Sequence, residues 1–132
     1  MSPQTIFPSL RYRDARAAVD WLADAFGFER VQVYEDNGVV HHAELRFGDS
    51  MIMFGQAREP QAGEYSAIAP APGSAALYAI TDHPDALHDR AKAAGAEIVQ
   101  PLRDQDYGSR EFTARDLDGN IWTFGTYDPS AG

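Results

Sequence analysis

The sequence contains no cysteine, which removes several kinds of chemistry from consideration. A disulfide framework, a thiolate nucleophile and a zinc site built on cysteine ligands are all excluded. Basic residues are also scarce, since the chain has 11 Lys and Arg against 20 Asp and Glu and a formal net charge of −9. Nucleic-acid binding needs a basic face, and binding to anionic lipid needs a basic cluster. The sequence therefore predicts neither a nucleic-acid partner nor a membrane partner.

Long apolar runs are missing as well. No stretch approaches the roughly 18 residues that a membrane-spanning helix needs. The first ten residues, MSPQTIFPSL, lack a basic region followed by a long apolar stretch, so no secretory signal is expected and the predicted location is cytoplasmic. Hydrophobic residues make up 44% of the 132 residues, enough for the core of one globular domain. We expect a single domain over residues 1–132.

The chain has two similar halves, separated by a segment at 58–74 that is rich in Pro, Gly and Ala and predicts a loop. In the first half, residues 5–12 predict a strand. A helix is expected to follow from Asp14 to Phe26, with Gly27 as its stop. Both the Asp that begins this helix and the Gly that ends it recur in the second half, displaced along the chain by one common interval.

The second half begins with a predicted strand at 75–81, and Asp82 and Gly95 then frame a predicted helix. The ends of the halves repeat too, because GDSMIMFG resembles LDGNIWTFG at nearly the same interval, with Phe54 matching Phe124. Alternating segments precede these motifs and predict half-buried strands. Each half therefore predicts the order strand–helix–strand–strand–strand, and such a repeat constrains the fold strongly.

Three segments carry a resemblance to a known family. They are LRYRDARAAVDWLADAFGFE at 10–29, AELRFGDSMIMFG at 43–55 and YGSREFTARDLDGNIWTFGTY at 107–127. Together with the duplicated unit, they make the chain similar to the vicinal-oxygen-chelate superfamily, which includes glyoxalase, bleomycin-resistance and dioxygenase proteins. It looks most like the small bacterial glyoxalase-like subgroup.

The resemblance implies an α+β fold in which two tandem βαβββ modules form a curved, partly open β-barrel cleft with helices on the outer face. Module 1 would span about 4–57, the linker 58–74, and module 2 about 75–128. Members of the family close their open sheet edges by pairing with a second chain, so a homodimer is expected.

The family's enzymes usually hold a divalent metal with His, Gln and Glu side chains on the first and last strands of each half. Such a metal needs several nitrogen or oxygen donors with open positions for substrate. The four corresponding positions here are Phe7, Met53, Ala76 and Thr123, none of which is a suitable ligand. We therefore expect no metal and no other cofactor.

Strand alternation assigns the faces. Phe54, Trp122 and Phe124 are expected to pack under the helices, so the opposite parity faces the cleft. Extending the interval between Phe54 and Phe124 to the third strand of each half pairs His42 with Phe112. The result is an aromatic and methionine-rich cleft that suits an organic ligand. The predicted ligand-binding residues are Phe7, Ser9, Arg11, His42, Met51, Met53, Tyr78, Arg110, Phe112 and Thr123.

Three functions remain open at this point. The first is a metal-independent binding protein that sequesters an aromatic or amphipathic compound such as an antibiotic, as bleomycin-resistance proteins do. The second is a metal-free isomerase or lyase, because His42 and Glu44 lie two residues apart on one strand face and could act as acid and base. The third is a glyoxalase-like metalloenzyme with other ligands. Binding is favoured over catalysis as a lyase or dioxygenase.

Overall fold

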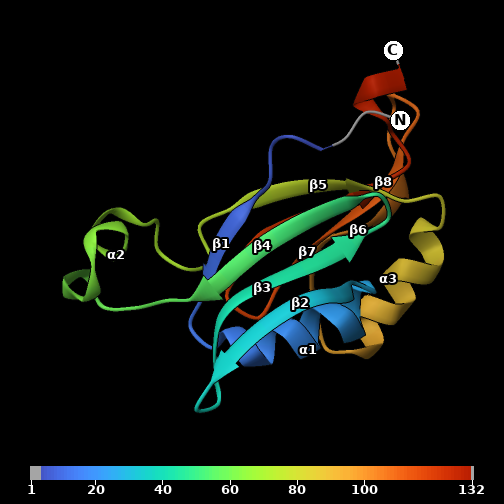
Figure 1. The fold of residues 1–132 in the computed structure, drawn as a ribbon. Helices are drawn as coiled ribbons and strands as arrows, with labels where there is room; N and C mark the ends of the chain where they lie inside the picture. Colours follow the sequence, from blue (N-terminus) through green and yellow to red (C-terminus); the bar gives the residue numbers. More distant parts are fainter. Residues whose placement is uncertain (1–3, 132) are drawn as a thin grey trace.

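The first half of the chain folds as one βαβββ unit, shown in blue to green in Figure 1. The computed structural model describes residues 4–131. The elements of this unit are β1 (Ser9–Tyr12), α1 (Ala15–Phe26), β2 (Glu29–Asp36), β3 (Val39–Phe47) and β4 (Ser50–Gln56). The strands form a sheet in the order β1-β4-β3-β2, in which β1 runs parallel to β4 and the other pairs are antiparallel.

The second half repeats this arrangement. Its elements are β5 (Ala76–Ile80), α3 (Pro84–Ala93), β6 (Glu97–Asp104), β7 (Arg110–Arg115), β8 (Ile121–Gly125) and a final short helix η2 (Pro129–Ala131). The sheet has the equivalent order β5-β8-β7-β6, with β5 parallel to β8. The predicted α+β class and the two tandem βαβββ units are confirmed, while the two sheets are not closed into a barrel.

The segment between the two sheets is not a simple loop. It contains a short helical turn η1 (Pro60–Ala62) and the helix α2 (Glu64–Ile68), neither of which has a buried residue. In Figure 1 this arm stands away from the sheets, whereas α1 and α3 lie against each other on one side of them. Within residues 4–131, no helix is long and apolar enough to cross a membrane.

Helix α1 begins and ends where the sequence predicts. Asp14 adopts an extended conformation and its Oδ1 accepts a hydrogen bond from the amide of Ala17 at 3.1 Å, which is N-capping. Gly27 ends the helix in the left-handed region at φ 78°, which favours glycine. The prediction that Asp82 caps the second helix is wrong. The cap position is His83, which makes no side-chain cap bond, and Pro84 opens the helix because its fixed φ suits the first turn.

Aromatic side chains from both units share one core. Phe26 of α1 packs against Trp122 and Phe124 of β8 at ring-centroid distances of 5.7 and 4.7 Å. Phe47 of β3 also contacts Phe124, at 5.6 Å. Trp122, which strand parity predicts to be buried, is 2% exposed. The two sheets are therefore joined through the faces that also contact the helices.

The strand register corrects two of the predicted ligand-binding residues. Phe112 pairs with Phe124, is 1% exposed and stacks on the Phe124 ring at 5.4 Å, so it belongs to the core. Arg110 shares this face and forms an ion pair with Asp85 of α3, with Nε at 2.8 Å from Oδ1. The predicted cleft orientation of Phe112 and Arg110 is wrong.

The cause is a difference between two turns. The turn between the paired Phe47 and Ser50 of the first unit is shorter than the turn between Arg115 and Ile121 of the second, and the two lengths differ by an odd number. Side chains along a strand alternate between its two faces. The interval that relates the last strands therefore assigns residues of the third strand to the wrong face. Leu45 pairs with Ile52 in the first unit, and Ala114 pairs with Trp122 at the equivalent place in the second. The interval that relates the third strands is therefore one residue shorter than the interval that relates the last strands.

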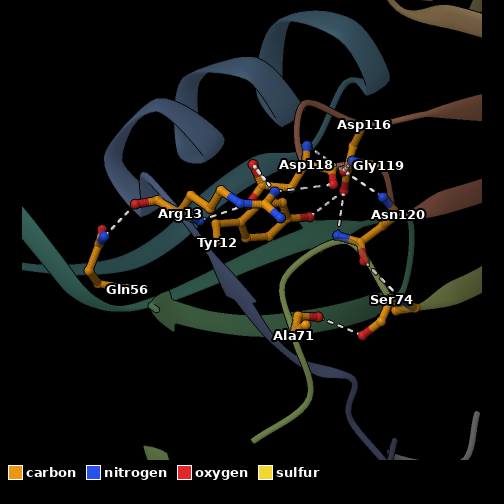
Figure 2. A network of polar contacts seen from close by, with 10 residues as sticks. Tyr12, Arg13, Gln56, Ala71, Ser74, Asp116, Asp118, Gly119 and Asn120 are labelled. Atoms are coloured by element: carbon orange, nitrogen blue, oxygen red, sulfur yellow. Dashed lines mark hydrogen bonds and ion pairs between the residues drawn. The ribbon is translucent and has the colours of Figure 1, made fainter. Parts of the chain in front are cut away.

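A buried carboxylate links the two units, as Figure 2 shows. Asp116 Oδ2 accepts hydrogen bonds from Tyr12 Oη at 2.6 Å, Asn120 Nδ2 at 2.9 Å and Trp122 Nε1 at 3.0 Å. Its Oδ1 accepts from three backbone amides of the following turn, those of residues 118–120. Burial raises the pKa of the Tyr12 phenol and the nearby Asp116 raises it further, which keeps Tyr12 protonated as a donor.

We predict that Tyr12→Phe lowers the free energy of unfolding by about 1.5–3 kcal/mol, because a buried carboxylate loses one of its donors. Chemical denaturation at neutral pH measures the change. Tyr34→Phe is the matched control, since Tyr34 is exposed on β2 and the same change should stay within about 0.5 kcal/mol. Equal effects of the two substitutions would contradict the structural role of the Tyr12 hydroxyl.

We further predict that Phe112→Ala destabilises the protein by about 3–5 kcal/mol, as Trp122→Ala should, because both remove a buried ring from one core. Thermal and chemical unfolding of the two variants provide the measurement. Leu117→Ala, in the exposed turn between β7 and β8, serves as the control. Wild-type stability of Phe112→Ala would mean that Phe112 faces solvent or ligand.

Candidate functional site

Each sheet has one face that packs on the core and one that helices α1 and α3 do not cover, which we call its open face. On the first sheet, the open face carries Ser9, Arg11, Met51, Met53, His42 and Glu44. The pairs Ser9–Met53 and Glu44–Met53 place three of these side chains next to one another. On the second sheet, Tyr78 pairs with Thr123 and Thr123 with Thr113.

An acid–base pair lies on the first open face. His42 Nε2 is 3.0 Å from Glu44 Oε2, and the two side chains are 40% and 30% exposed, so both are accessible to a ligand. The ring of Tyr34 lies beside His42 at a centroid distance of 6.0 Å. The predicted proximity of His42 and Glu44 is therefore observed. His41 is also exposed, because the register shift of β3 against β2 falls at this residue and interrupts the alternation of faces between Val40 and His42.

Arg11 of β1 contacts the arm, the segment that contains α2. Its guanidinium donates to the carbonyl of Gln56 at 3.1 and 3.3 Å and to Ser66 Oγ at 3.4 Å, and it lies 5.3 Å from the centre of the Tyr65 ring. A polar hollow of about 470 Å³ lies between this arm and β1, and Ser9, Arg11 and His42 help to line it. Arg11 is thus already engaged by several partners within the chain.

A second hollow, of about 510 Å³, lies between the two sheets and is mostly apolar. Met51 and Tyr78 contribute from the predicted ligand-binding set. Phe28, Phe47 and Trp122 add aromatic surface to the wall, and aliphatic and a few polar residues complete it. The alternation of residues along a strand does not predict this apolar hollow. Residues from both faces of the strands line it, at the edge where the two sheets meet.

The predicted ligand-binding residues are therefore not gathered in one trough. Met53 and Thr123 lie on the open faces but line neither hollow, and Phe7 precedes β1 with a partly exposed ring. Thr123 Oγ1 is hydrogen-bonded to Thr113 Oγ1 at 2.9 Å, and Thr113 Oγ1 donates to Gln100 Oε1 at 3.0 Å.

Glu111 on β7 is a polar residue of the second open face that the sequence prediction missed. Its Oε2 accepts a hydrogen bond from Ser109 Oγ at 2.9 Å, and its Oε1 accepts one from Tyr107 Oη. Gly125 pairs with Glu111, and a Cβ at Gly125 would lie 2.8 Å from both Glu111 Oε2 and Tyr78 Oη. The lack of a side chain at Gly125 therefore makes room for these two groups to approach each other.

Two tyrosines near Glu111 have raised pKa values. The hydrogen bond to Glu111 raises the pKa of Tyr107 to about 12. Burial raises the pKa of Tyr78, to which the negative charge of Glu111 contributes. Tyr78 Oη donates to the carbonyl of Tyr127 at 2.7 Å. Both phenols remain neutral near pH 7 and can act as hydrogen-bond donors. With the corrected register, Glu111 occupies the position in β7 that His42 occupies in β3. The sequence would then have predicted Glu111 on the open face.

The side chains at the positions where the family's enzymes carry a metal offer a poor donor set. Phe7 and Ala76 have no donor atoms in their side chains, Met53 offers a thioether, and the Thr123 hydroxyl is bonded to Thr113. Within residues 4–131, no three His, Cys, Asp or Glu side chains converge as a metal ligand set would. These residues do not fit a catalytic divalent cation.

Comparison with known proteins agrees with the fold. A family model described as the Glyoxalase/Bleomycin resistance protein/Dioxygenase superfamily matches residues 5–124. An uncharacterized protein of Mycobacterium bovis is 31% identical over 122 residues, with 89% of this chain and 80% of that protein covered. An uncharacterized protein of Mycobacterium tuberculosis has the same identity, with 71% of its length covered.

Two solved structures illustrate the similarity. TioX from Micromonospora sp. ML1 has a TM-score of 0.79 and 33% identity, with 92% of this chain and 97% of TioX covered. A family protein from Burkholderia phytofirmans PsJN has a TM-score of 0.72 at 20% identity, with 90% and 94% covered, and supports the fold alone. By sequence and by structure, the chain belongs to the Glyoxalase/Bleomycin resistance protein/Dioxygenase superfamily.

Proposed function

We propose that this protein binds and sequesters an aromatic or amphipathic small molecule, such as an antibiotic, without a metal. The observation that carries the proposal is the chemistry of the four positions at which metal-dependent members of the family hold their ion. They are occupied here by Phe7, Met53, Ala76 and Thr123. A carbonyl or hydroxyl substrate could not be polarised by a metal held there, so binding rather than Lewis-acid catalysis follows.

The apolar hollow between the sheets supports this proposal. Its volume of about 510 Å³ falls in the range of ligand sites, and aromatic side chains with a few polar groups are the usual lining of such sites. Met51 adds a flexible, polarisable side chain that adapts to varied ligand shapes. Phe47, which is only partly buried, offers ring surface on which a flat ligand can pack.

The test is a thermal-shift screen of planar antibiotics and aromatic acids, followed by calorimetry on compounds that stabilise the protein. Met51→Ala and Tyr78→Ala should weaken binding by about 5- to 150-fold, equivalent to about 1–3 kcal/mol, because contacts in a desolvated pocket are lost. Leu117→Ala, which lines neither hollow, should leave affinity unchanged. Excess chelator should have no effect, and the compound should be recovered chemically unchanged.

A second candidate function rests on the 3.0 Å contact between His42 and Glu44. This pair could move a proton in a metal-free isomerase or lyase. Mass spectrometry of the recovered compound separates the alternatives. A product that forms with the wild type, but not with Glu44→Gln or His42→Gln, would replace sequestration by catalysis. A product whose formation stops with chelator would indicate a metalloenzyme instead.

We also propose that the protein is a homodimer. The edge strands of both sheets lie unpaired on one side in the single chain, and uncovered edges are normally blocked or paired. His42 and Glu44 on the first open face are also accessible. Large apolar side chains are exposed on the N-terminal segment, the arm and β5, at Ile6, Ile68 and Ile80.

Sedimentation at micromolar concentration should therefore report about twice the chain mass of 14.5 kDa. A dilution series should show dissociation toward single chains at lower concentration. A monomer across the whole series would contradict the proposal, and the open faces would then be solvent-exposed in the working protein.

A further inference from the structure

Glu111 is a buried carboxylate without a cationic partner. It is 9% exposed, and its hydrogen-bond donors are the hydroxyls of Ser109 and Tyr107. Among residues 4–131, none of the ion pairs with Arg or His includes it. A buried charge is costly unless it is paired, so a cation that reached Glu111 would be strongly favoured.

Three partly exposed tyrosines lie near this carboxylate. Tyr107 donates a hydrogen bond to it, and Tyr107, Tyr127 and Tyr78 are 59%, 48% and 39% exposed. The rings of Tyr107 and Tyr127 meet edge to face at 6.3 Å, and Tyr78 Oη bonds the Tyr127 carbonyl. Aromatic faces attract ammonium groups, and a neighbouring carboxylate adds a negative charge that strengthens this attraction. We call Glu111 with these three rings the tyrosine–glutamate cluster.

The cluster adjoins the apolar hollow through one residue. Tyr78 lines that hollow, and a Cβ built on Gly125 would be 2.8 Å from Tyr78 Oη and equally close to Glu111 Oε2. A ligand with an aromatic body and a nearby charged nitrogen could therefore contact both places. The net charge of −9 also raises the local concentration of cations around the protein.

We propose that the tyrosine–glutamate cluster binds the cationic nitrogen of an aromatic amine or quaternary ammonium ligand, whose ring system occupies the apolar hollow. This inference rests on the proposed binding function and narrows the ligand to cationic compounds. The ammonium group contacts Glu111 Oε1 and the faces of Tyr107 and Tyr127. Since Tyr107 Oη already bonds Oε1, an incoming N–H donor shares or displaces that bond.

Three probes that share a naphthalene ring, two of them cationic and one neutral, test the proposal by calorimetry. They are 2-(aminomethyl)naphthalene, its N,N,N-trimethylammonium derivative and the uncharged 2-(hydroxymethyl)naphthalene. The wild type should bind both cations at least about 10-fold more tightly than the alcohol, and this preference should shrink as salt is added. Glu111→Gln, which keeps the shape of the side chain, should abolish the preference while the alcohol binds as before.

Two further variants make the result specific. Glu29→Gln changes the net charge equally at an exposed position of β2 and should retain the preference. Tyr107→Phe keeps the ring but frees Oε1, so it should bind the cations at least as tightly as the wild type. A loss of cation binding in Tyr107→Phe would overturn the proposal, because the hydroxyl bond would then be structural.

The outcomes separate this inference from the proposed function. Equal binding of all three probes by the wild type would overturn the cation site and leave sequestration of aromatic compounds standing. A preference that survives in Glu111→Gln would also overturn it. If no probe and no compound of the wider screen binds, both proposals fail together. The wild-type comparison needs no variant, so it holds even if Glu111→Gln does not fold.

Discussion

The arrangement of the whole chain depends on one buried carboxylate, that of Asp116. It receives six hydrogen bonds, of which one comes from Tyr12 in the first unit and five from the turn and strand that follow it in the second. The hydrogen bond from Tyr12 to this buried group forms only when the two units are docked, whereas the other five come from the unit of Asp116 itself. The same docking places Trp122 and Phe124 against Phe26 of α1, and Trp122 then forms a wall of the hollow between the sheets. The geometry of the apolar hollow is thus a consequence of this contact.

A second contact also joins the two units, at the C-terminal end of α1. Arg90 of α3 donates to the carbonyls of Ala23 and Asp24 at 2.9 and 2.8 Å, in the last turn of the helix, where carbonyls lack donors further along the helix. The Ala23 carbonyl also accepts from the Gly27 amide at 3.2 Å. Gly27 permits this approach, because a Cβ there would lie 3.3 Å from the Arg90 guanidinium and φ is positive. The helix end, which the sequence predicts from Gly27 alone, is therefore also a joint between the units.

Features that depend on local chemistry could be predicted from the sequence, and features that depend on counting across a turn could not. The cap at Asp14, the stop at Gly27 and the buried Trp122 follow from propensity and alternation. Alternation puts Phe112 and Arg110 on the wrong face because the turn from 116 to 120 is longer than its counterpart by an odd number of residues. The same shift conceals Glu111. The contacts of Arg11 with the arm and the hollow between the sheets depend on tertiary packing, for which the pattern of one strand holds no information.

The corrected register places the polar chemistry of both units at equivalent positions. His42 of β3 and Glu111 of β7 correspond once the longer turn is taken into account, and both face away from the core. In each unit the polar group lies on a middle strand, whereas the positions associated with metal in the family hold groups such as Met53 and Thr123. Under the proposed function, such a site interacts with its ligand through proton donors, acceptors and charge rather than through a Lewis acid. Its two halves differ, since His42 is already partnered by Glu44 at 3.0 Å while Glu111 has only neutral donors. The duplicated units therefore present chemically different groups on their two open faces.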